Sequence, residues 1–263
     1  MKITSVNLIP DSEQLEQSLQ LQRTYGTAFE YNDFISPSML DNRAAVEERI
    51  SQYQGLNRDC SRDTLHGVIY DILVHSLDPM VREVANHRIR QSMDIAAALG
   101  VRGVIFHTNL RGDFTEPMYQ QGYLAANEQY WKQLLSDYPK LCVYLENVFD
   151  ASPDMLCRLA ERMKTEPRFG VCFDIGHAFL TKSAQAEWLD GILPYTKHLH
   201  LNDNMGQSDE HLALGEGRID WNLFVSKMQS HPGDATALLE VKGYERQLES
   251  LRFCESRFKT LLL

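Results

Sequence analysis

The sequence predicts an α/β fold, a single closed (β/α)8 barrel domain that spans residues 1–263. Eight short apolar or alternating runs recur along the chain, and stretches with helical periodicity separate them. A chain of 263 residues is long enough for such a barrel to form as one domain. Open nucleotide-binding sheets are disfavoured because the chain contains neither GxGxxG nor GxxxxGK[ST].

The candidate strands are short and rich in β-branched, aromatic and aliphatic residues. They cover residues 3–8, 28–31, 64–69, 103–107, 141–146, 170–174, 198–201 and 237–241. Because helical stretches alternate with them, we expect a parallel sheet. Eight such units favour closure into a barrel over an open sheet.

The clearest candidate helix covers residues 79–99. Its apolar residues recur with a period close to 3.6, Asp78 and Pro79 form a typical start, and Gly100 a typical end. Residues 127–138, 152–163 and 221–229 show the same pattern, and the polar segment 43–62 is interpreted as a helix plus a loop.

Composition limits the classes of function. Hydrophobic residues make up 43% and charged residues 24%, as in globular proteins. The excess of 36 acidic over 26 basic residues argues against a broad surface for binding nucleic acid, although a local basic patch would escape this argument. The sequence has no stretch that predicts a membrane span or a signal peptide, and its five cysteines form no CxxC pair. We therefore expect a cytoplasmic protein with no membrane partner.

Residues that ligate metals recur at the carboxyl ends of six consecutive candidate strands. These strand-end residues are His66, His107, Glu146, Asp174, His200 and Glu240, and the adjoining loops add His177, Asp209 and His211. In a parallel barrel all these ends meet at one face, where barrel enzymes have their active sites. A carboxylate that ends an apolar strand is costly unless a partner or a metal compensates its charge.

Each of these residues has a less specific interpretation. A single strand histidine is more often a hydrogen-bonded core residue, and Asp209 alone would be read as a loop or cap residue. The repetition at the same end of six strands instead predicts a metal site. Mixed imidazole and carboxylate ligands suit Zn²⁺, Mn²⁺ or Fe²⁺, and the residues would hold one to three ions.

Other polar residues around this site receive secondary roles. His198 shares the strand parity of His200 and is expected in the barrel interior. Asn147 and Asn202 are candidates for orienting the ligands, and Lys242 faces either the pocket or the rim. The loop at residues 215–217, Gly-Glu-Gly, is either a tight turn or a close approach to substrate.

The ordered blocks VIFHTN, VYLENV, VCFDIGHAF, HLHLNDN, DEHLALGEGRIDW and LLEVKG resemble the xylose isomerase-like barrel superfamily. This superfamily includes sugar-phosphate isomerases and epimerases, and apurinic endonucleases of the endonuclease IV type. In the first branch, the resemblance implies one divalent metal on Glu146, Asp174, His200 and Glu240, with the two glutamates as the acid/base pair.

In the endonuclease IV branch, the resemblance implies three zinc ions. The first would be held by His66, His107 and Glu146, the second by Glu146, Asp174, His200 and Glu240, and the third by His177, Asp209 and His211. The sequence lacks an arginine-rich loop suited to the DNA minor groove.

The sequence therefore predicts first a divalent-metal-dependent sugar or sugar-phosphate isomerase or epimerase with a small carbohydrate substrate. The second prediction is a trinuclear zinc phosphodiesterase, and a purely structural metal is the third. Neither the substrate nor the oligomeric state follows from the sequence.

Overall fold

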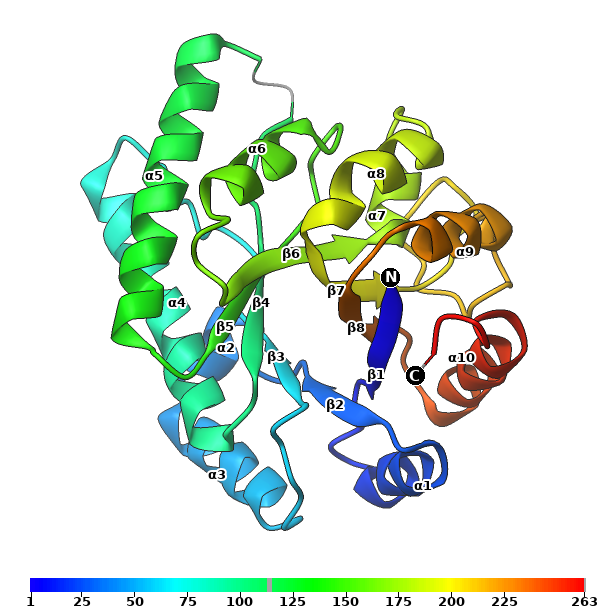
Figure 1. Ribbon diagram of the computed structural model, residues 1–263. Coiled ribbons are helices and arrows are strands. Elements are labelled where there is room, and N and C mark those ends of the chain that lie inside the picture. The colour runs from blue at the N-terminus through cyan, green and yellow to red at the C-terminus, as the bar shows by residue number, and fades with distance from the viewer. Residues whose placement is uncertain (113–114, 263) are drawn as a thin grey trace.

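Eight parallel strands close into a barrel in the computed structural model, which describes residues 1–112 and 115–262 (Figure 1). Each strand pairs with its neighbours in sequence, and β8 pairs with β1 to close the ring. The strands are β1 (Lys2–Leu8), β2 (Ala28–Tyr31), β3 (Thr64–His66), β4 (Gly103–His107), β5 (Cys142–Glu146), β6 (Phe169–Asp174), β7 (Thr196–Leu201) and β8 (Asp234–Leu239). The predicted (β/α)8 barrel is confirmed.

Helices between the strands cover the outside of the barrel (Figure 1). They are α1 (Leu15–Tyr25), α2 (Pro37–Leu40), α3 (Arg43–Gln54), α4 (Pro79–Leu99), α5 (Pro117–Asp137), α6 (Asp154–Arg162), α7 (Ile175–Phe179), α8 (Gln185–Ile192), α9 (Trp221–Ser230) and α10 (Tyr244–Arg257), with a 3₁₀ turn η1 (Leu193–Tyr195). Within the described residues, no helix is both long enough and apolar enough to cross a membrane.

Helix α4 has the predicted bounds and caps. The Asp78 carboxylate accepts a hydrogen bond from the backbone N–H of Met80 at 2.8 Å, and Gly100 ends the helix at φ 72°. Helix α5 begins ten residues before the predicted start at position 127. Because its first turns are mostly exposed, they carry no apolar stripe that sequence periodicity could detect.

Strand β8 is displaced toward the N-terminus relative to its predicted range of 237–241, and it ends at Leu239. Its pairing with β1 begins at Asp234, opposite Lys2. Glu240 therefore follows the strand, but its N–H still donates to the carbonyl of Leu201 at 2.9 Å. This hydrogen bond keeps Glu240 at the level of the barrel mouth.

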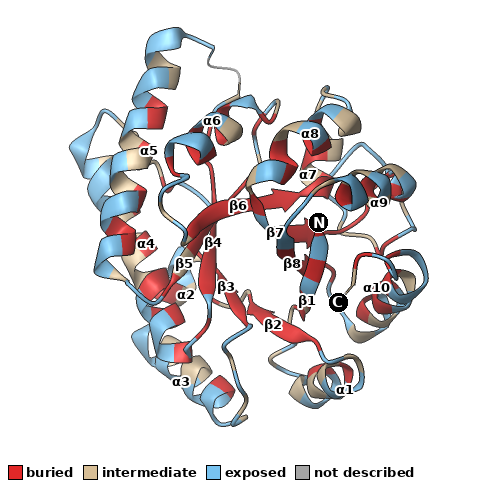
Figure 2. Ribbon diagram, in the orientation of Figure 1, coloured by how far each residue is buried: buried red, intermediate tan, exposed pale blue. Residues whose placement is uncertain are grey.

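The barrel interior is filled in layers, whereas most apolar burial lies between the strands and the helices (Figure 2). Ile105, Tyr144 and Cys172 form a small inner cluster, and the ring of His198 stacks on Tyr144 with centroids 5.8 Å apart. Side chains two residues apart on a strand point to the same face, so the next side chains along β5, β6 and β7 also point into the barrel. These next side chains are Glu146, Asp174 and His200.

Candidate metal centre

The structure brings all nine predicted ligands to the carboxyl-terminal mouth of the barrel. Their ligand atoms form the three predicted groups and one more, made of His66, His200 and Glu240, and within each group the atoms lie within 4.8 Å of one another. The first group is His66, His107 and Glu146, the second is Glu146, Asp174, His200 and Glu240, and the third is His177, Asp209 and His211. Every strand-end ligand is buried, whereas the third group lies partly exposed at the entrance.

In the first group, two imidazoles converge on one carboxylate oxygen. Glu146 Oε2 lies 3.2 Å from His66 Nε2 and 3.5 Å from His107 Nε2. The Nδ1–H of His66 donates to the carbonyl of Gly67 at 3.0 Å, which leaves a lone pair on its Nε2 in the neutral ring. A lone pair and a carboxylate oxygen face each other favourably only with a proton or a cation between them.

In the second group, His200 presents Nδ1 to two carboxylates. Glu240 Oε2 lies 3.3 Å from this nitrogen and Glu146 Oε1 lies 3.4 Å from it. Neither His200 Nδ1 nor Glu146 Oε1 has a hydrogen-bond partner among the described residues, although both are fully buried. Such orphaned polar atoms carry a large desolvation cost, and a divalent cation between them would satisfy both.

In the third group, two histidines share one oxygen of Asp209. His177 Nε2 lies 3.2 Å from Asp209 Oδ2, and His211 Nε2 lies 2.8 Å from it. The Nδ1 atoms of these histidines contact the carbonyls of Asn147 and Glu240, both at 2.9 Å. The main chain thus fixes both rings with Nε2 toward Asp209, as in metal sites whose histidines donate their other N–H to a carbonyl.

The charges in the centre are strongly coupled. Burial raises the pKa of Asp174 to about 8, and the negative charges of Glu240 and Glu146 add to this effect. Burial opposes charge on His211 as well, but the hydrogen bond to Asp209 raises its pKa to about 9. The negative charges of these carboxylates therefore require compensation by protons or by cations.

These residues fit a divalent cation that accepts imidazole and carboxylate ligands, such as Zn²⁺, Mn²⁺ or Fe²⁺. Cys172, His198 and His200 also lie close together, but they do not form a comparable site. Burial raises the pKa of the Cys172 thiol well above its usual range, which disfavours the thiolate that a metal needs. His198 already contacts Thr236 Oγ1 at 2.6 Å and Glu30 Oε2 at 3.0 Å, in agreement with its predicted interior position.

Glu30 on β2 is a site residue that the sequence analysis missed. Its Oε1 lies 3.1 Å from His200 Nε2, and its Oε2 accepts a hydrogen bond from Thr64 at 2.6 Å. Burial would raise its pKa, but the neighbouring imidazoles of His200 and His198 lower it well below the usual range. Glu30 is therefore a buried carboxylate that forms an ion pair with the His200 ring, without a hydrogen bond between the two side chains.

Two predicted orienting residues contact the ligands directly. The side-chain amide of Asn202 donates to Asp174 Oδ2 at 3.0 Å and to Glu240 Oε2 at 3.3 Å. Asn147 exchanges two hydrogen bonds, both 2.9 Å, with the backbone of Asp174. These contacts agree with the roles expected from the sequence.

The loop after β7 is held by buried Asp203, which accepts hydrogen bonds from Gly215 N at 2.9 Å and from Trp221 Nε1 at 2.8 Å. A Cβ atom at Gly217 would lie 2.2 Å from Asp203 Oδ1, so only glycine fits there. The Gly-Glu-Gly segment thus acts as a tight turn against Asp203, and the structure supports that alternative over an approach to substrate.

A cavity of about 620 Å³ opens directly above the ligands. Apolar side chains of Ile9, Ile35 and Ile69 line its wall, and Lys242 and Arg246 also line it. Tyr70 and Phe149, which are 58% and 56% exposed, contribute aromatic surface to the same cavity.

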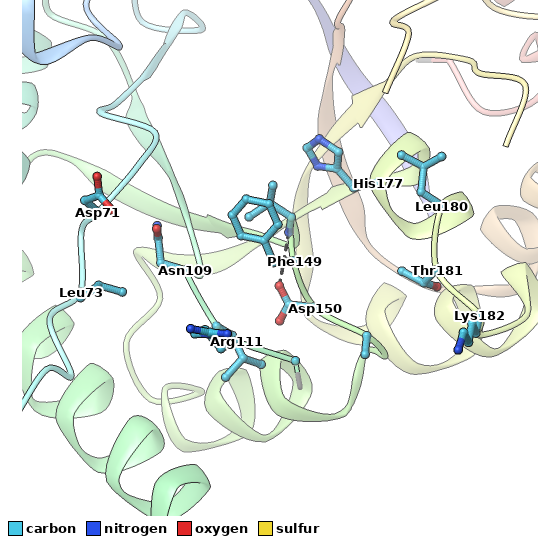
Figure 3. A pocket seen from close by; sticks show the side chains of 14 residues that line it. Asp71, Leu73, Asn109, Arg111, Phe149, Asp150, His177, Leu180, Thr181 and Lys182 are labelled. Atoms are coloured by element: carbon cyan, nitrogen blue, oxygen red, sulfur yellow. Dashed lines mark hydrogen bonds between the residues drawn. The ribbon is translucent and has the colours of Figure 1, made fainter. Parts of the chain in front are cut away.

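A second hollow of about 870 Å³ adjoins the first one and shares His177, Phe149, Val148 and Leu180 with it. Figure 3 shows Asp71 and Asn109 on one side of this outer hollow, Thr181 and Lys182 on the other, and Phe149 between them. The metal centre therefore lies at the base of an extended depression rather than in a closed pocket.

Comparisons with known proteins agree with this architecture. Probable endonuclease 4 of Mycobacterium leprae is 28% identical over 177 residues, which make up 61% of this chain and 66% of that protein. A Thermus thermophilus protein, solved after soaking with ZnCl2, superposes with a TM-score of 0.73 at 23% identity and 99% coverage of both chains. A D-tagatose 3-epimerase-like protein superposes with a TM-score of 0.72 at 19% identity, covering 99% of this chain and 98% of that one.

At these identities the two solved structures support the fold alone. The family model described as "Xylose isomerase-like TIM barrel" matches residues 24–257, which is most of the chain. This chain therefore belongs to the xylose isomerase-like TIM barrel family.

Proposed function

We propose that this protein is a multinuclear metal-dependent hydrolase of phosphate esters, with a small phosphodiester as its substrate. The observation that carries the proposal is the third ligand group, in which His177 and His211 both direct Nε2 at Asp209. A sugar isomerase that works with one metal on the strand-end residues has no need of this group. Three adjoining groups of ligands suit the coordinated cations of phosphoester hydrolysis.

Bound divalent cations would polarise the phosphoryl oxygens and lower the pKa of water at the site. The residues of the chain position these cations and the substrate. Glu146 contributes one oxygen to each of the first two groups, so it sets the spacing between them. His177 and Asp209 place the third group next to the entrance, where an ester would arrive from solvent.

The shape of the depression supports a diester. The two substituents on a diester phosphorus point in different directions, and the inner cavity and the outer hollow meet at His177 and Phe149. Each hollow lies in the size range of small-molecule sites, so together they exceed the needs of a monosaccharide. The exposed ring of Phe149 lies where both substituents would contact it.

We propose a small molecule rather than duplex DNA as the substrate. The net charge of −10 disfavours a long polyanion, since duplex affinity depends on many lysine and arginine contacts to phosphates. The similarity to Probable endonuclease 4 covers 61% of this chain, which keeps DNA with an abasic site in the test panel.

A sugar or sugar-phosphate isomerase or epimerase is the second candidate. In the second ligand group, Glu146 and Glu240 both lie within 3.4 Å of His200 Nδ1, so two carboxylates flank one metal position. Such a pair could remove and return a proton at a carbon next to a carbonyl. The similarity of fold to a D-tagatose 3-epimerase-like protein is compatible with this reaction.

A substrate panel distinguishes the candidates. Protein purified without chelator is assayed with bis(4-nitrophenyl) phosphate, with abasic-site DNA, and with ketoses and ketose phosphates, in the presence of Zn²⁺ or Mn²⁺. We expect metal-dependent release of nitrophenol that is lost in Glu146→Gln and retained in Glu249→Gln, an exposed residue on α10. Epimerisation of a ketose without any ester cleavage would overturn the hydrolase in favour of the second candidate.

A further inference from the structure

Lys242 and Arg246 line the inner cavity beside the metal ligands, and the proposed reaction does not use them. We propose that these two cations bind a second anionic group of the substrate, a phosphate or a carboxylate that does not react. This inference rests on the proposed function and specifies its substrate class as a small diester with an additional anionic group.

The first argument is that neither cation is neutralised by the protein. Among the described residues, no hydrogen bond or ion pair reaches the side chain of Lys242 or Arg246, whereas Arg49, Arg88 and Arg90 each pair with an aspartate. Glu210 lines the same cavity, but its carboxylate accepts a hydrogen bond from Met205 N at 2.8 Å. In a chain with ten more acidic than basic residues, two unpaired cations facing one cavity are available to a ligand.

The second argument is the backbone that joins them. Lys242 follows Glu240 by two residues, and Arg246 lies in the first turn of α10. Between them Gly243 has φ 90°, a left-handed conformation that glycine adopts at low cost, and no side chain caps the start of α10. The uncapped N–H groups at Tyr244 and beyond add partial positive charge to the same rim.

The third argument is charge. Four carboxylates, those of Glu146, Asp174, Asp209 and Glu240, belong to the three ligand groups. With a divalent cation on each group, the positive charge would offset these carboxylates together with those of Glu30 and Glu210, so the floor of the cavity would leave Lys242 and Arg246 without an anionic partner. A phosphate or carboxylate satisfies this requirement, because arginine binds such groups through two N–H donors and lysine through a point charge.

The experiment uses metal-loaded protein and three matched probes. The first is the 4-nitrophenyl ester of deoxythymidine 5′-phosphate, the second also carries a 3′-phosphate, and the third carries a 3′-carboxymethyl ether. Binding is measured by titration calorimetry and hydrolysis by nitrophenol release, for the wild type and for Lys242→Gln/Arg246→Gln. Lys259→Gln, which removes an exposed cation that lines neither hollow, is the matched control. Metal content confirms that each variant retains its centre.

We expect the 3′-anionic probes to bind the wild type about tenfold more tightly than the first probe, and the double variant to lose this preference. Its metal content should stay unchanged, and Lys259→Gln should bind all three probes as the wild type does. The better of the two anionic probes identifies phosphate or carboxylate as the natural group. The single variant Arg246→Lys, which keeps the positive charge, should retain part of the preference for the 3′-anionic probes.

Equal binding of all three probes by the wild type, no binding of any of them, or a preference that survives in the double variant would overturn the inference. Binding that depends on Lys242 and Arg246 without any hydrolysis would leave the anion site in place and refute the proposed reaction. Hydrolysis of all three probes with equal KM would support the proposed reaction and refute the anion site.

Discussion

Glu30 Oε1 lies 3.1 Å from His200 Nε2 in the barrel interior, on the side of the ring opposite to the nitrogen that faces Glu146 and Glu240. Both side chains are completely buried. The relationship links β2, which carries no ligand, to the ligand on β7. It also explains how a histidine that is buried on all sides presents only one of its two nitrogens to a metal.

Replacement of Glu30 should therefore weaken metal binding without removing a ligand. We expect Glu30→Gln to lower the affinity of the second ligand group about 10–100-fold, since the amide orients the ring but does not raise its basicity. Competition with a chromogenic chelator measures this affinity. Glu48→Gln on the exposed face of α3 is the control, and an unchanged affinity in Glu30→Gln would refute the orienting role.

Variants of Glu146 and Asp174 should differ in the number of metal ions they lose. Because Glu146 belongs to the first and second ligand groups and Asp174 to the second alone, Glu146→Gln should lose up to two ions per chain and Asp174→Asn one. Elemental analysis after gel filtration gives both numbers. Full occupancy in both variants would contradict the assignment of the strand-end ligands.

Metal removal should destabilise the fold. The empty centre keeps several carboxylates close together, and a ligand that binds only the folded state stabilises it by about 2.7 kcal/mol at a hundredfold excess over Kd. For a chain of this size we expect the melting temperature to fall by about 5–10 °C with chelator and to recover with Zn²⁺ or Mn²⁺. An unchanged melting temperature after verified metal removal would argue against a site of this charge density.

The stability of the metal-free protein should depend on His211 in the alkaline range. Its folded pKa is raised to about 9 by the hydrogen bond to Asp209, above the usual value of 6.5. The stabilisation is therefore complete below pH 6.5 and is lost as the pH rises to 9 and beyond. Chelator-treated protein should lose stability over this window in urea titrations, and His211→Gln should show a smaller loss. If the free energy of unfolding depended on pH in the same way in both proteins, His211 would be excluded as the source of this dependence.

Much of the centre could be predicted from the sequence because parallel strands deliver their ends to one face. Among the candidate ligands, His66, His107, Glu146 and Asp174 each end a strand, and His200 lies one residue before the end of β7. Glu30 was missed because its contact with His200 depends on barrel closure, which brings the interior side chains of β2 and β7 together, and no spacing in the sequence reveals this contact. The helix α1 has only two buried residues, Ser18 and Leu21, and therefore shows too little apolar periodicity to be assigned.

The contacts of loop residues depended on tertiary structure. Asp209 and His211 were predicted as ligands, but their convergence with His177 requires the turn that Asp203 holds together through hydrogen bonds to residues 12 and 18 positions further along the chain, which the sequence does not reveal. His211 also adopts a positive φ of 49°, which spacing alone does not reveal.

The central claim is that the third ligand group holds a metal, and the metal count of Asp209→Asn/His211→Ala tests it most directly. Elemental analysis of this variant is compared with the wild type and with Glu210→Gln, a control in the same loop. The account predicts one metal ion fewer per chain in the double variant, with the other ions retained, an unchanged count in the control, and loss of phosphodiester hydrolysis. An unchanged metal count in the double variant would contradict it and would leave His177 and His211 as contacts to substrate.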